Sequence, residues 1–336
     1  MGPDHSLPAI ASSESRPMSL LQRFPLILLF TAFFLGGALP GWSREPVTPG
    51  ASQEARDVLH YLDSLQGKQT LSGQMATPWG VDEMALVEKI TGRLPALQGH
   101  DLIHEKDNPQ EVAAAIAWWQ AGGIPTVMWH WGAPTHGDGY EQSKTEIDVA
   151  QCFIEGSPEH TAMWADLRRI ADHLTTLRDA GVPVLWRPLH EFDGGWFWYG
   201  KGGKDDFTRL WRTMFDYFAR ERKLTNLLWV LCHSHTPLEG WDPGREYYDL
   251  AGADTYGDTA GLFEKIQTLH GPDTPIPLHE CGTLPDPDAA LRNGTMWSWW
   301  MLWHTDHLTS HDPAELKRIY HHDSVITRDE LPRFLP

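Results

Sequence analysis

A chain of 336 residues with 41% hydrophobic and 21% charged residues can bury a substantial core, which excludes a largely disordered protein. The formal net charge is -18, and so acidic a surface repels phosphate backbones and argues against nucleic acid as a partner. A neutral polymer such as a polysaccharide is not repelled. The 17 tryptophans are an unusually large number; many should lie in the core, and a surplus in loops would suit stacking on sugar rings or other flat ligands.

The first 43 residues have the pattern of a secretory signal peptide. Arg16 and Arg23 precede an uncharged apolar run, FPLILLFTAFFLGGAL, and the small residues of GWS follow it. This pattern predicts cleavage near Ser43, with Met18 as an alternative start, and a secreted protein in the extracellular space or the periplasm. An uncleaved anchor is the competing interpretation, because the run is about long enough to span a bilayer. The Gly-Gly pair and the proline at its end favour cleavage, which would leave no stable membrane association.

Residues 44–52, REPVTPGAS, are expected to form a short polar linker, and residues 53–336 a single catalytic domain. The chain has three cysteines, Cys152, Cys232 and Cys281, at spacings that match no metal motif. One disulfide between two of them is possible, but a core of this size does not depend on a disulfide framework.

Short apolar runs alternate with helical patterns along this domain. The predicted strands are TLSG, LPALQ, IPTVMW, VPVLWR, NLLWVLC, LAGAD, PIPLH and MWSWWM. Several are continuously apolar, as strands buried on both faces are. Eight strands alternating with helices predict a (β/α)8 TIM barrel. A doubly wound sheet is the alternative, but it would require a glycine-rich phosphate loop after the first strand, and TLSGQMATPWG is not one.

In a (β/α)8 barrel the functional side chains lie at the C-terminal ends of the strands. Nearly every predicted strand end here has a histidine, an acid or an aromatic residue. These ends are GHD (99–101), HW (130–131), HE (190–191), HSH (233–235), DTY (254–256), HEC (279–281) and WHTD (303–306).

Two of these strand ends have matching His-Glu pairs. Glu191 follows the fourth predicted strand in RPLHE, and Glu280 follows the seventh in IPLHE. Strands four and seven face each other across the mouth of a closed barrel, so the two carboxyl groups would repel each other and their pKa values would separate. One protonated acid and one ionised carboxylate are the pair that glycoside hydrolysis requires, held about 5–5.5 Å apart in retaining enzymes and further apart in inverting ones. The alternative is that each Glu forms a structural salt bridge.

The longest of these motifs resembles a known family. RPLHEFDGGWFWYG is similar to the acid/base motif of glycoside hydrolase family 26, the β-mannanases of the large retaining (β/α)8 clan. That family has His before the acid/base Glu, and His190 occupies this position. LHECG resembles the nucleophile strand, AGADTYG the sixth strand end and TVMWHW the third. The likeness runs from LSGQ near Leu71 to WHTD near Asp306.

The resemblance implies Glu191 as acid/base and Glu280 as nucleophile. It implies that His190 bonds the substrate or positions the nucleophile, and that Tyr256 orients Glu280. The residues expected to bind substrate are His130, Trp131, His190, Trp196, Tyr256 and Trp303.

Among these, Trp196 would form a sugar platform near the cleaved bond, His130 would line the same subsite, and Trp303 would be the floor beneath the ring being cleaved. No residues match the outer subsites, so endo and exo cleavage both stay open. The segment GDGYEQSKTEID (137–148) is either an ordered loop over the cleft or a solvated insertion.

No cofactor and no metal are expected. The histidine-rich stretches HSH, HTDHLTSHD and HH lack the helical spacing of a catalytic zinc pair. Trp118 and Trp119 are expected in the core, together with at least one of the aromatic residues 196–198. We expect a monomer that cleaves β-1,4-mannosidic bonds in mannan, glucomannan or galactomannan. The alternatives are another β-linked polymer (β-xylan or β-glucan), exo action as a mannobiohydrolase, and a non-catalytic carbohydrate-binding protein.

Overall fold

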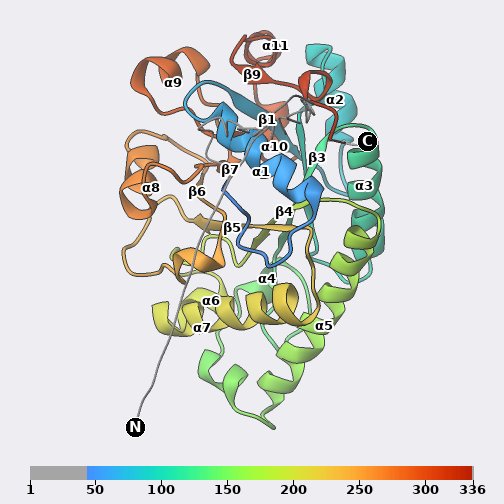
Figure 1. Cartoon of the computed structure of the whole chain (residues 1–336), viewed down its shortest axis with the longest axis vertical. Coiled ribbons are helices and arrows are strands. Elements are labelled where there is room, and N and C mark those ends of the chain that lie inside the picture. The colour runs from blue at the N-terminus through green and yellow to red at the C-terminus, as the bar shows by residue number, and fades with distance from the viewer. Residues whose placement is uncertain (1–43, 335–336) are drawn as a thin grey trace, which may run out of the picture. The chain divides into compact units, whose positions relative to one another are not determined.

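A closed barrel of parallel strands forms the centre of the computed structural model, which describes residues 44–334 (Figure 1). Each strand pairs in parallel with the next, and β8 pairs with β1, so that the sheet closes. The strands are β1 (Thr70–Met75), β2 (Leu97–Asp101), β3 (Ile124–Trp129), β4 (Val184–Pro188), β5 (Leu227–His233), β6 (Leu250–Thr255), β7 (Leu278–Cys281) and β8 (Trp299–Leu302). All eight overlap the predicted apolar runs, in part only for β2 and β7, and the (β/α)8 barrel is confirmed. The predicted signal peptide lies outside the described residues.

Helices follow the strands and cover the outside of the barrel (Figure 1). The longer ones are α1 (Gln53–Leu65), α2 (Glu83–Thr91), α3 (Asn108–Gln120), α5 (Pro158–Asp179), α7 (Lys204–Phe215), α8 (Leu262–His270), α9 (Pro287–Asn293) and α11 (Pro313–Tyr320). Three single turns, α4 (Tyr140–Ser143), α6 (Trp198–Lys201) and α10 (Asp306–Thr309), lie in the connections. A π-helix (Asp216–Glu221) continues α7. Within the described part of the chain, no helix has both the length and the apolar character to cross a bilayer.

Helix α5 shows how the sequence pattern produces this packing. Ser157 caps its first turn by accepting a hydrogen bond from the His160 amide, and Pro158 supplies a helical φ at the first position. Its apolar side chains recur at helical spacing and form the face that is buried against the barrel. They are Met163, Leu167, Ile170, Ala171, Leu174 and Leu177.

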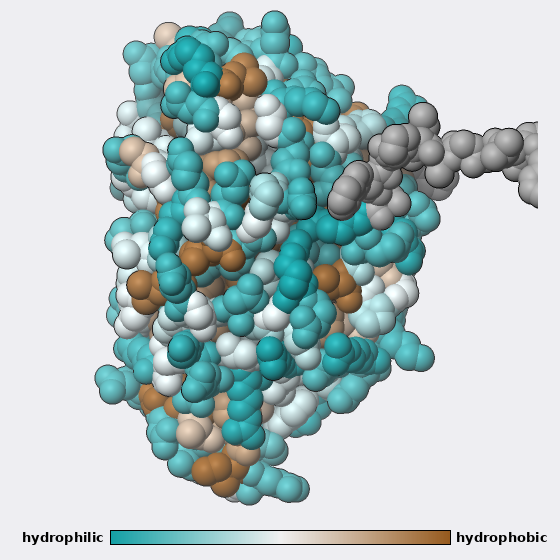
Figure 2. Space-filling view, turned by 60° about the vertical axis from the view of Figure 1, so that its left-hand side comes forward, coloured by the Kyte–Doolittle hydropathy of each residue, from teal (hydrophilic) through white to brown (hydrophobic). Residues whose placement is uncertain are grey.

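A ninth strand, β9 (Val325–Ile326), pairs with β1 and was not predicted. Two residues are too few to show a periodic pattern. Trp118, Trp119 and Trp198 are buried, as expected of core tryptophans. All three cysteines are buried and free, so the possible disulfide is not formed. The face shown in Figure 2 is mainly hydrophilic, with apolar residues in small separate patches, in keeping with the acidic composition.

Residues 44–52 do not form a linker, because they pack on the barrel. The Val47 amide donates to Asp249 Oδ1 at 2.8 Å, and the Thr48 hydroxyl donates to the Leu227 carbonyl at 2.7 Å. Asp249 Oδ2 accepts from the Trp229 amide at 2.8 Å. Since Leu227 begins β5 and Asp249 directly precedes β6, the segment covers the N-terminal end of the barrel, opposite the predicted site. Motif spacing could not reveal this, because the contacts span about 180 or more residues of sequence.

We predict that Asp249→Ala lowers the free energy of unfolding by about 2–4 kcal/mol. The substitution removes the acceptor of the Val47 and Trp229 amides, which are then left without a hydrogen-bond partner. Urea unfolding of the purified chain measures this. Asp179→Ala, which removes only an exposed pairing with Arg178, is the matched control and should change stability by less than about 1 kcal/mol. Equal effects of the two substitutions would show that the N-terminal segment is not anchored in this way.

Candidate active site

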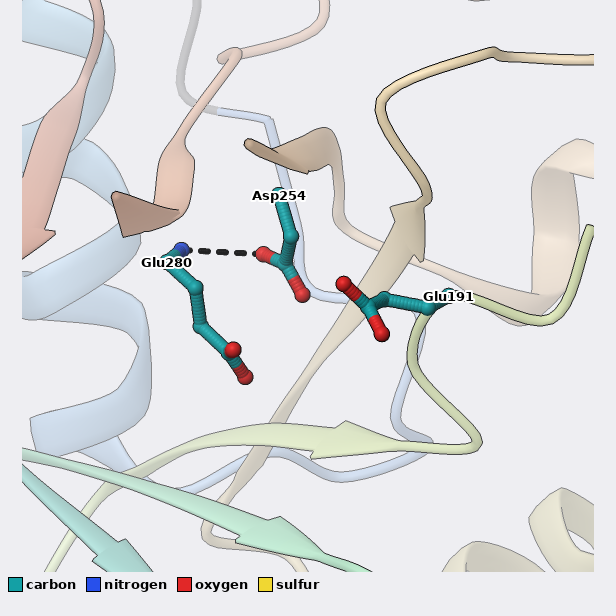
Figure 3. A group of neighbouring side chains, drawn as sticks. All are labelled: Glu191, Asp254 and Glu280. Atoms are coloured by element: carbon teal, nitrogen blue, oxygen red, sulfur yellow. Dashed lines mark hydrogen bonds between the residues drawn. The ribbon is translucent and has the colours of Figure 1, made fainter. Parts of the chain in front are cut away.

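The two predicted glutamates meet at the C-terminal mouth of the barrel, together with Asp254. One carboxylate oxygen from each of Glu191, Asp254 and Glu280 lies within 4.8 Å of the other two. Figure 3 shows the three side chains converging from the ends of β4, β6 and β7. Asp254 and Glu280 are buried, and Glu191 is half-buried. The opposition of strands four and seven, expected from the fold alone, brings the two glutamates together as predicted.

The backbone at the end of β4 is strained around Glu191. Leu189 and Glu191 have φ values of 48° and 51°, in the left-handed region. For residues other than glycine this conformation costs about 1–2 kcal/mol each, and such strain is characteristic of functional sites. Hydrogen bonds hold the turn: the Glu191 amide donates to the Cys232 carbonyl at 2.8 Å, and the Gly194 amide donates to the Glu191 carbonyl at 2.9 Å. The turn thereby aims the Glu191 carboxyl group into the mouth.

Gly194 and Gly195 allow Trp196 to lie beside Glu191. A Cβ atom on Gly194 would lie 2.2 Å from the Trp196 ring, and Gly195 has a φ of 80°. Trp196 Nε1 donates to Glu191 Oε2 at 2.8 Å. The indole also lies parallel to the His235 ring, with centroids 6.0 Å apart. Trp196 is therefore a direct hydrogen-bond partner of Glu191.

Glu280 is surrounded by donors that stabilise a carboxylate rather than a carboxylic acid. The buried Arg187 guanidinium donates from Nη2 to Glu280 Oε1 and from Nη1 to Asp254 Oδ2, the latter at 2.6 Å. The Tyr256 hydroxyl donates to Glu280 Oε2 at 2.5 Å. The Glu280 amide donates to Asp254 Oδ1 at 2.9 Å, where the pairing register of β6 and β7 shifts. His190 Nε2 lies 3.9 Å from Glu280 Oε1.

The pKa of Glu191 is raised to about 8, first because burial disfavours its charged form and then because Glu280 is close by. The Trp196 indole opposes this shift only in part. Burial also raises the pKa of Asp254 well above its ordinary value, although Arg187 opposes the shift. At neutral pH Glu191 therefore holds a proton, whereas Glu280 is the carboxyl that Arg187 and Tyr256 hold by hydrogen bonds.

Asp101, His130 and His190 form a hydrogen-bonded row beside this pair. His130 Nδ1 lies 2.5 Å from Asp101 Oδ2, and His130 Nε2 lies 3.1 Å from His190 Nε2. Burial lowers the pKa of His130, but the Asp101 carboxylate more than offsets this, so the net shift is upward. Burial and the nearby Arg187 lower the pKa of His190 well below its usual range, so this ring is neutral.

A cavity of about 520 Å³ opens over the two glutamates. His130, Tyr256 and Trp303 line it, as expected from the sequence, whereas His190 and Trp196, also predicted to bind substrate, are not among its lining residues. Tyr140 also lines it and belongs to residues 137–148, so this segment reaches the cleft and is not simply a solvated insertion. Trp79, from the loop after β1, forms a further wall.

Trp131 lies away from the cavity and does not have the predicted position. It is 1% exposed, its ring stacks on Trp129 at 4.2 Å, and its Nε1 donates to Asp166 of α5 at 2.9 Å. Successive side chains at a strand end point in opposite directions. Since His130 faces the mouth, its neighbour points toward the helix layer. Trp131 is thus a core residue that links β3 to α5.

Sequence reasoning missed Arg187, and it placed Asp254 at a functional strand end without giving it a role. Both lie inside otherwise apolar strands, and a charge in such a strand requires a buried partner. The isolated charges in VLWRP and LAGAD were visible in the sequence. They could have suggested that Arg187 and Asp254 pair with each other. Trp79 and Tyr140 gave no such signal, because loop aromatic residues have no periodic pattern.

Glu191, Asp254 and Glu280 are also the three carboxyl groups close enough to share a metal ion within the described residues. Arg187 already donates to Asp254 and Glu280, and its fixed positive charge would repel a divalent cation placed among them. The histidine-rich stretches contribute no cluster of three ligands in the part of the chain that is described. The arrangement fits proton transfer and nucleophilic attack better than metal binding.

Comparison with known proteins identifies the family of the chain. The model of Glycosyl hydrolase family 26 matches residues 47–330. The chain belongs to glycosyl hydrolase family 26. The resemblance inferred from RPLHEFDGGWFWYG and LHECG is thereby confirmed.

Relatives of the chain in this family include proteins named as mannanases. The chain is 33% identical over 313 residues to a mannan endo-1,4-beta-mannosidase of Thermothelomyces thermophilus, and the alignment covers 86% of this chain and 64% of the relative. The Podospora anserina GH26-CBM35 beta-(1,4)-mannanase aligns with a TM-score of 0.79 at 30% identity, covering 86% of this chain and 69% of that one. A beta-mannanase from a symbiotic protist of the termite Reticulitermes speratus, complexed with gluco-manno-oligosaccharide, aligns with a TM-score of 0.76 at 33% identity, covering 86% and 97%. The chain spans between 50% and 64% of the length of three curated relatives.

We predict that Glu280→Gln lowers the pKa of Glu191 below about 8, because the nearby negative charge that raises it is removed. Titration of the glutamate side chains by carbon NMR measures this, with Glu191→Gln identifying the signal. Glu315→Gln removes a carboxylate on the exposed face of α11 and should leave the Glu191 titration unchanged. An unchanged Glu191 titration in Glu280→Gln would mean that the two groups do not interact.

Proposed function

We propose that the chain is a secreted retaining glycoside hydrolase that cleaves β-1,4-mannosidic bonds. Glu191 protonates the glycosidic oxygen while Glu280 attacks the anomeric carbon, forming a glycosyl-enzyme and releasing the leaving sugar. Glu191, now ionised, takes a proton from a water molecule, which attacks the anomeric carbon and frees Glu280. Because Glu191 must begin protonated, kcat/KM should fall as the pH rises through its pKa of about 8.

The spacing of the carboxyl groups is the observation that carries this proposal. Oxygens of Glu191 and Glu280 approach within 4.8 Å. Retaining enzymes hold the two groups about 5–5.5 Å apart, whereas inverting enzymes need roughly 6.5–9.5 Å to admit a water molecule. The spacing therefore favours direct attack by Glu280. The hydrogen bonds donated to Glu280 and the raised pKa of Glu191 support Glu280 as the nucleophile and Glu191 as the acid.

A mannan substrate is supported by the relatives and by the cavity. The matched proteins named above are mannanases, and one of them was solved with a gluco-manno-oligosaccharide. Trp79, Tyr140 and Tyr256 are among the exposed large apolar side chains, and all three line the cavity, where they can stack on sugar rings. Secretion is supported by the pattern of residues 1–43, and a monomer remains our expectation. N-terminal sequencing of exported protein and size-exclusion chromatography test these two points.

We predict that Glu280→Ala abolishes mannan hydrolysis and that Glu191→Ala lowers kcat by about 100- to 10,000-fold, the usual contribution of a general acid. Glu191→Ala should lose far less activity on an aryl mannoside whose leaving group needs no protonation. Reducing-end release measures both variants. Glu88→Ala, on the exposed side of α2, is the matched control and should keep full activity. Near-full mannan activity in Glu280→Ala would contradict the assignment of the nucleophile.

The substrate is tested by a side-by-side assay of glucomannan, galactomannan, β-xylan and β-glucan. We expect the mannans to be cleaved fastest, and mannan as the poorest substrate would overturn the proposed specificity. Binding of mannooligosaccharides without any reducing-end release would favour a carbohydrate-binding protein. On mannohexaose, a single disaccharide product would indicate exo action, and a mixture would indicate endo action.

A further inference from the structure

A chain of hydrogen bonds runs behind the Glu191 turn, outside the cavity. Asp193 Oδ2 lies 2.6 Å from His233 Nδ1, and His233 Nε2 lies 2.8 Å from His270 Nε2. His270 Nδ1 lies 2.9 Å from the Tyr248 hydroxyl, which lies 2.8 Å from Asp242 Oδ2. We call these five residues the Asp193–Asp242 chain. It joins the loop after β4, the end of β5, the end of α8 and the segment before β6.

The chain is buried along almost its whole length. The side chains of Asp193, His233 and His270 are at most 2% exposed, and Tyr248 is fully buried. Asp242, at the far end, is 41% exposed and connects the chain to the surface. Water cannot readily replace a missing hydrogen bond in the buried part, so each contact there must have its own proton.

Counting protons shows that the Asp193–Asp242 chain needs one more than its neutral residues supply. The four contacts are all at hydrogen-bond distance, and each requires one proton. Two neutral imidazoles supply two protons and the Tyr248 hydroxyl supplies a third, while two carboxylates supply none. The fourth proton converts one histidine of the chain into an imidazolium. Without it, two lone pairs would face each other at one contact.

The surroundings assign this proton to His233. Burial alone would raise the pKa of Asp193, but hydrogen bonds from His233 and from the Ser234 and Leu238 amides lower it overall, so Asp193 is ionised. Burial and the neighbouring His233 lower the pKa of His270 to about 4, so His270 is neutral. An imidazolium at His233 would donate to both of its partners.

The charged and titratable groups that face His233 come from three elements. Asp193, from the loop after β4, is the adjacent anion, and His270 of α8 is the neutral acceptor. Beyond His270 lie Tyr248, Asp242 and Arg245 of the segment before β6, with the Arg245 guanidinium 4.7 Å from the centre of the Tyr248 ring. Among residues 44–334, Asp193 is thus the carboxylate in direct contact with His233.

The chain also fastens one wall of the site. Asp193 accepts from the Ser234 amide at 2.8 Å and from the Leu238 amide at 2.9 Å, so it ties the loop after β5 to the turn that carries Glu191. That loop contains His235, whose ring lies parallel to Trp196. Trp196 in turn donates to Glu191. His233 is therefore connected to Glu191 through Asp193, the loop after β5 and the Trp196 indole.

We propose that the Asp193–Asp242 chain is a positioning device that holds one extra proton, located on His233, and that this proton fixes the Trp196–His235 wall beside Glu191. The part that concerns catalysis rests on the proposed function, whereas the location of the proton does not. Without that proton His233 could not donate to both Asp193 and His270, and the turn that carries Glu191 would lose one of its supports. Asp193, His233, His270, Tyr248 and Asp242 are positioning residues and do not touch the substrate.

The test uses Tyr248→Phe, which changes the proton count without changing any charge. Removing the hydroxyl leaves two contacts, Asp193–His233 and His233–His270, which two neutral imidazoles satisfy. Tyr320→Phe is the matched control, because the Tyr320 hydroxyl is also buried and has no hydrogen-bond partner among the described residues. Both variants keep the ring and its packing.

Nitrogen NMR of the histidine-labelled full chain locates the proton without any substrate, and His233→Gln and His270→Gln identify the two rings. We expect one imidazolium in the pair at pH 7, and we expect its titration to move at least about one pH unit lower in Tyr248→Phe but not in Tyr320→Phe. The alkaline limb of kcat/KM should move in the same direction, with the rate at acidic pH unchanged.

Two neutral rings at pH 7 in the unmodified chain would overturn the inference, whatever the enzyme's activity. An imidazolium whose titration is the same in Tyr248→Phe would also overturn it. An imidazolium that responds as expected in a chain that cleaves no mannan would support the proton assignment and refute the proposed function instead. A response in the NMR titration without any change in the pH profile would refute the link to Glu191.

Discussion

The buried guanidinium of Arg187 is the interaction on which the rest of the site depends. It joins Asp254 of β6 and Glu280 of β7 to β4, and all three side chains are at most 3% exposed. Removing one partner of such a buried ion pair costs about 3–5 kcal/mol, because the remaining charge loses its compensation. The barrel therefore cannot keep Arg187 inside without both acids. This requirement places Glu280 at one fixed point of the mouth.

Arg187 also creates the difference between the two glutamates. Its hydrogen bonds go to Glu280 and Asp254, whereas Glu191 has the uncharged Trp196 indole as its side-chain donor. Two carboxyl groups a few ångströms apart would otherwise compete for the same proton. The asymmetry lets Glu191 keep the proton, while Glu280 is the carboxyl group that Arg187 holds. The strained turn at Glu191 then holds its carboxyl group beside Glu280, at a cost that the surrounding hydrogen bonds offset.

Much of this arrangement could be predicted from the sequence, because it depends on repeated patterns. Eight apolar runs specified the barrel, and the position of Glu191 and Glu280 after strands four and seven specified their encounter. Trp131 was misplaced, because a one-residue step along a strand end reverses the direction of a side chain. The packing of residues 44–52 and the roles of Tyr140 and Trp79 come from contacts between distant segments, which leave no local pattern.

The stereochemistry of the reaction tests the central claim most directly. If Glu280 attacks the anomeric carbon and water then attacks the glycosyl-enzyme, each step inverts that carbon and the product keeps the β configuration. Proton NMR of a mannooligosaccharide digest, recorded before the released sugar mutarotates, reads the configuration of the new reducing end. The account predicts that the β anomer appears first and that the α anomer follows only as mutarotation proceeds. An α anomer as the first product would contradict it.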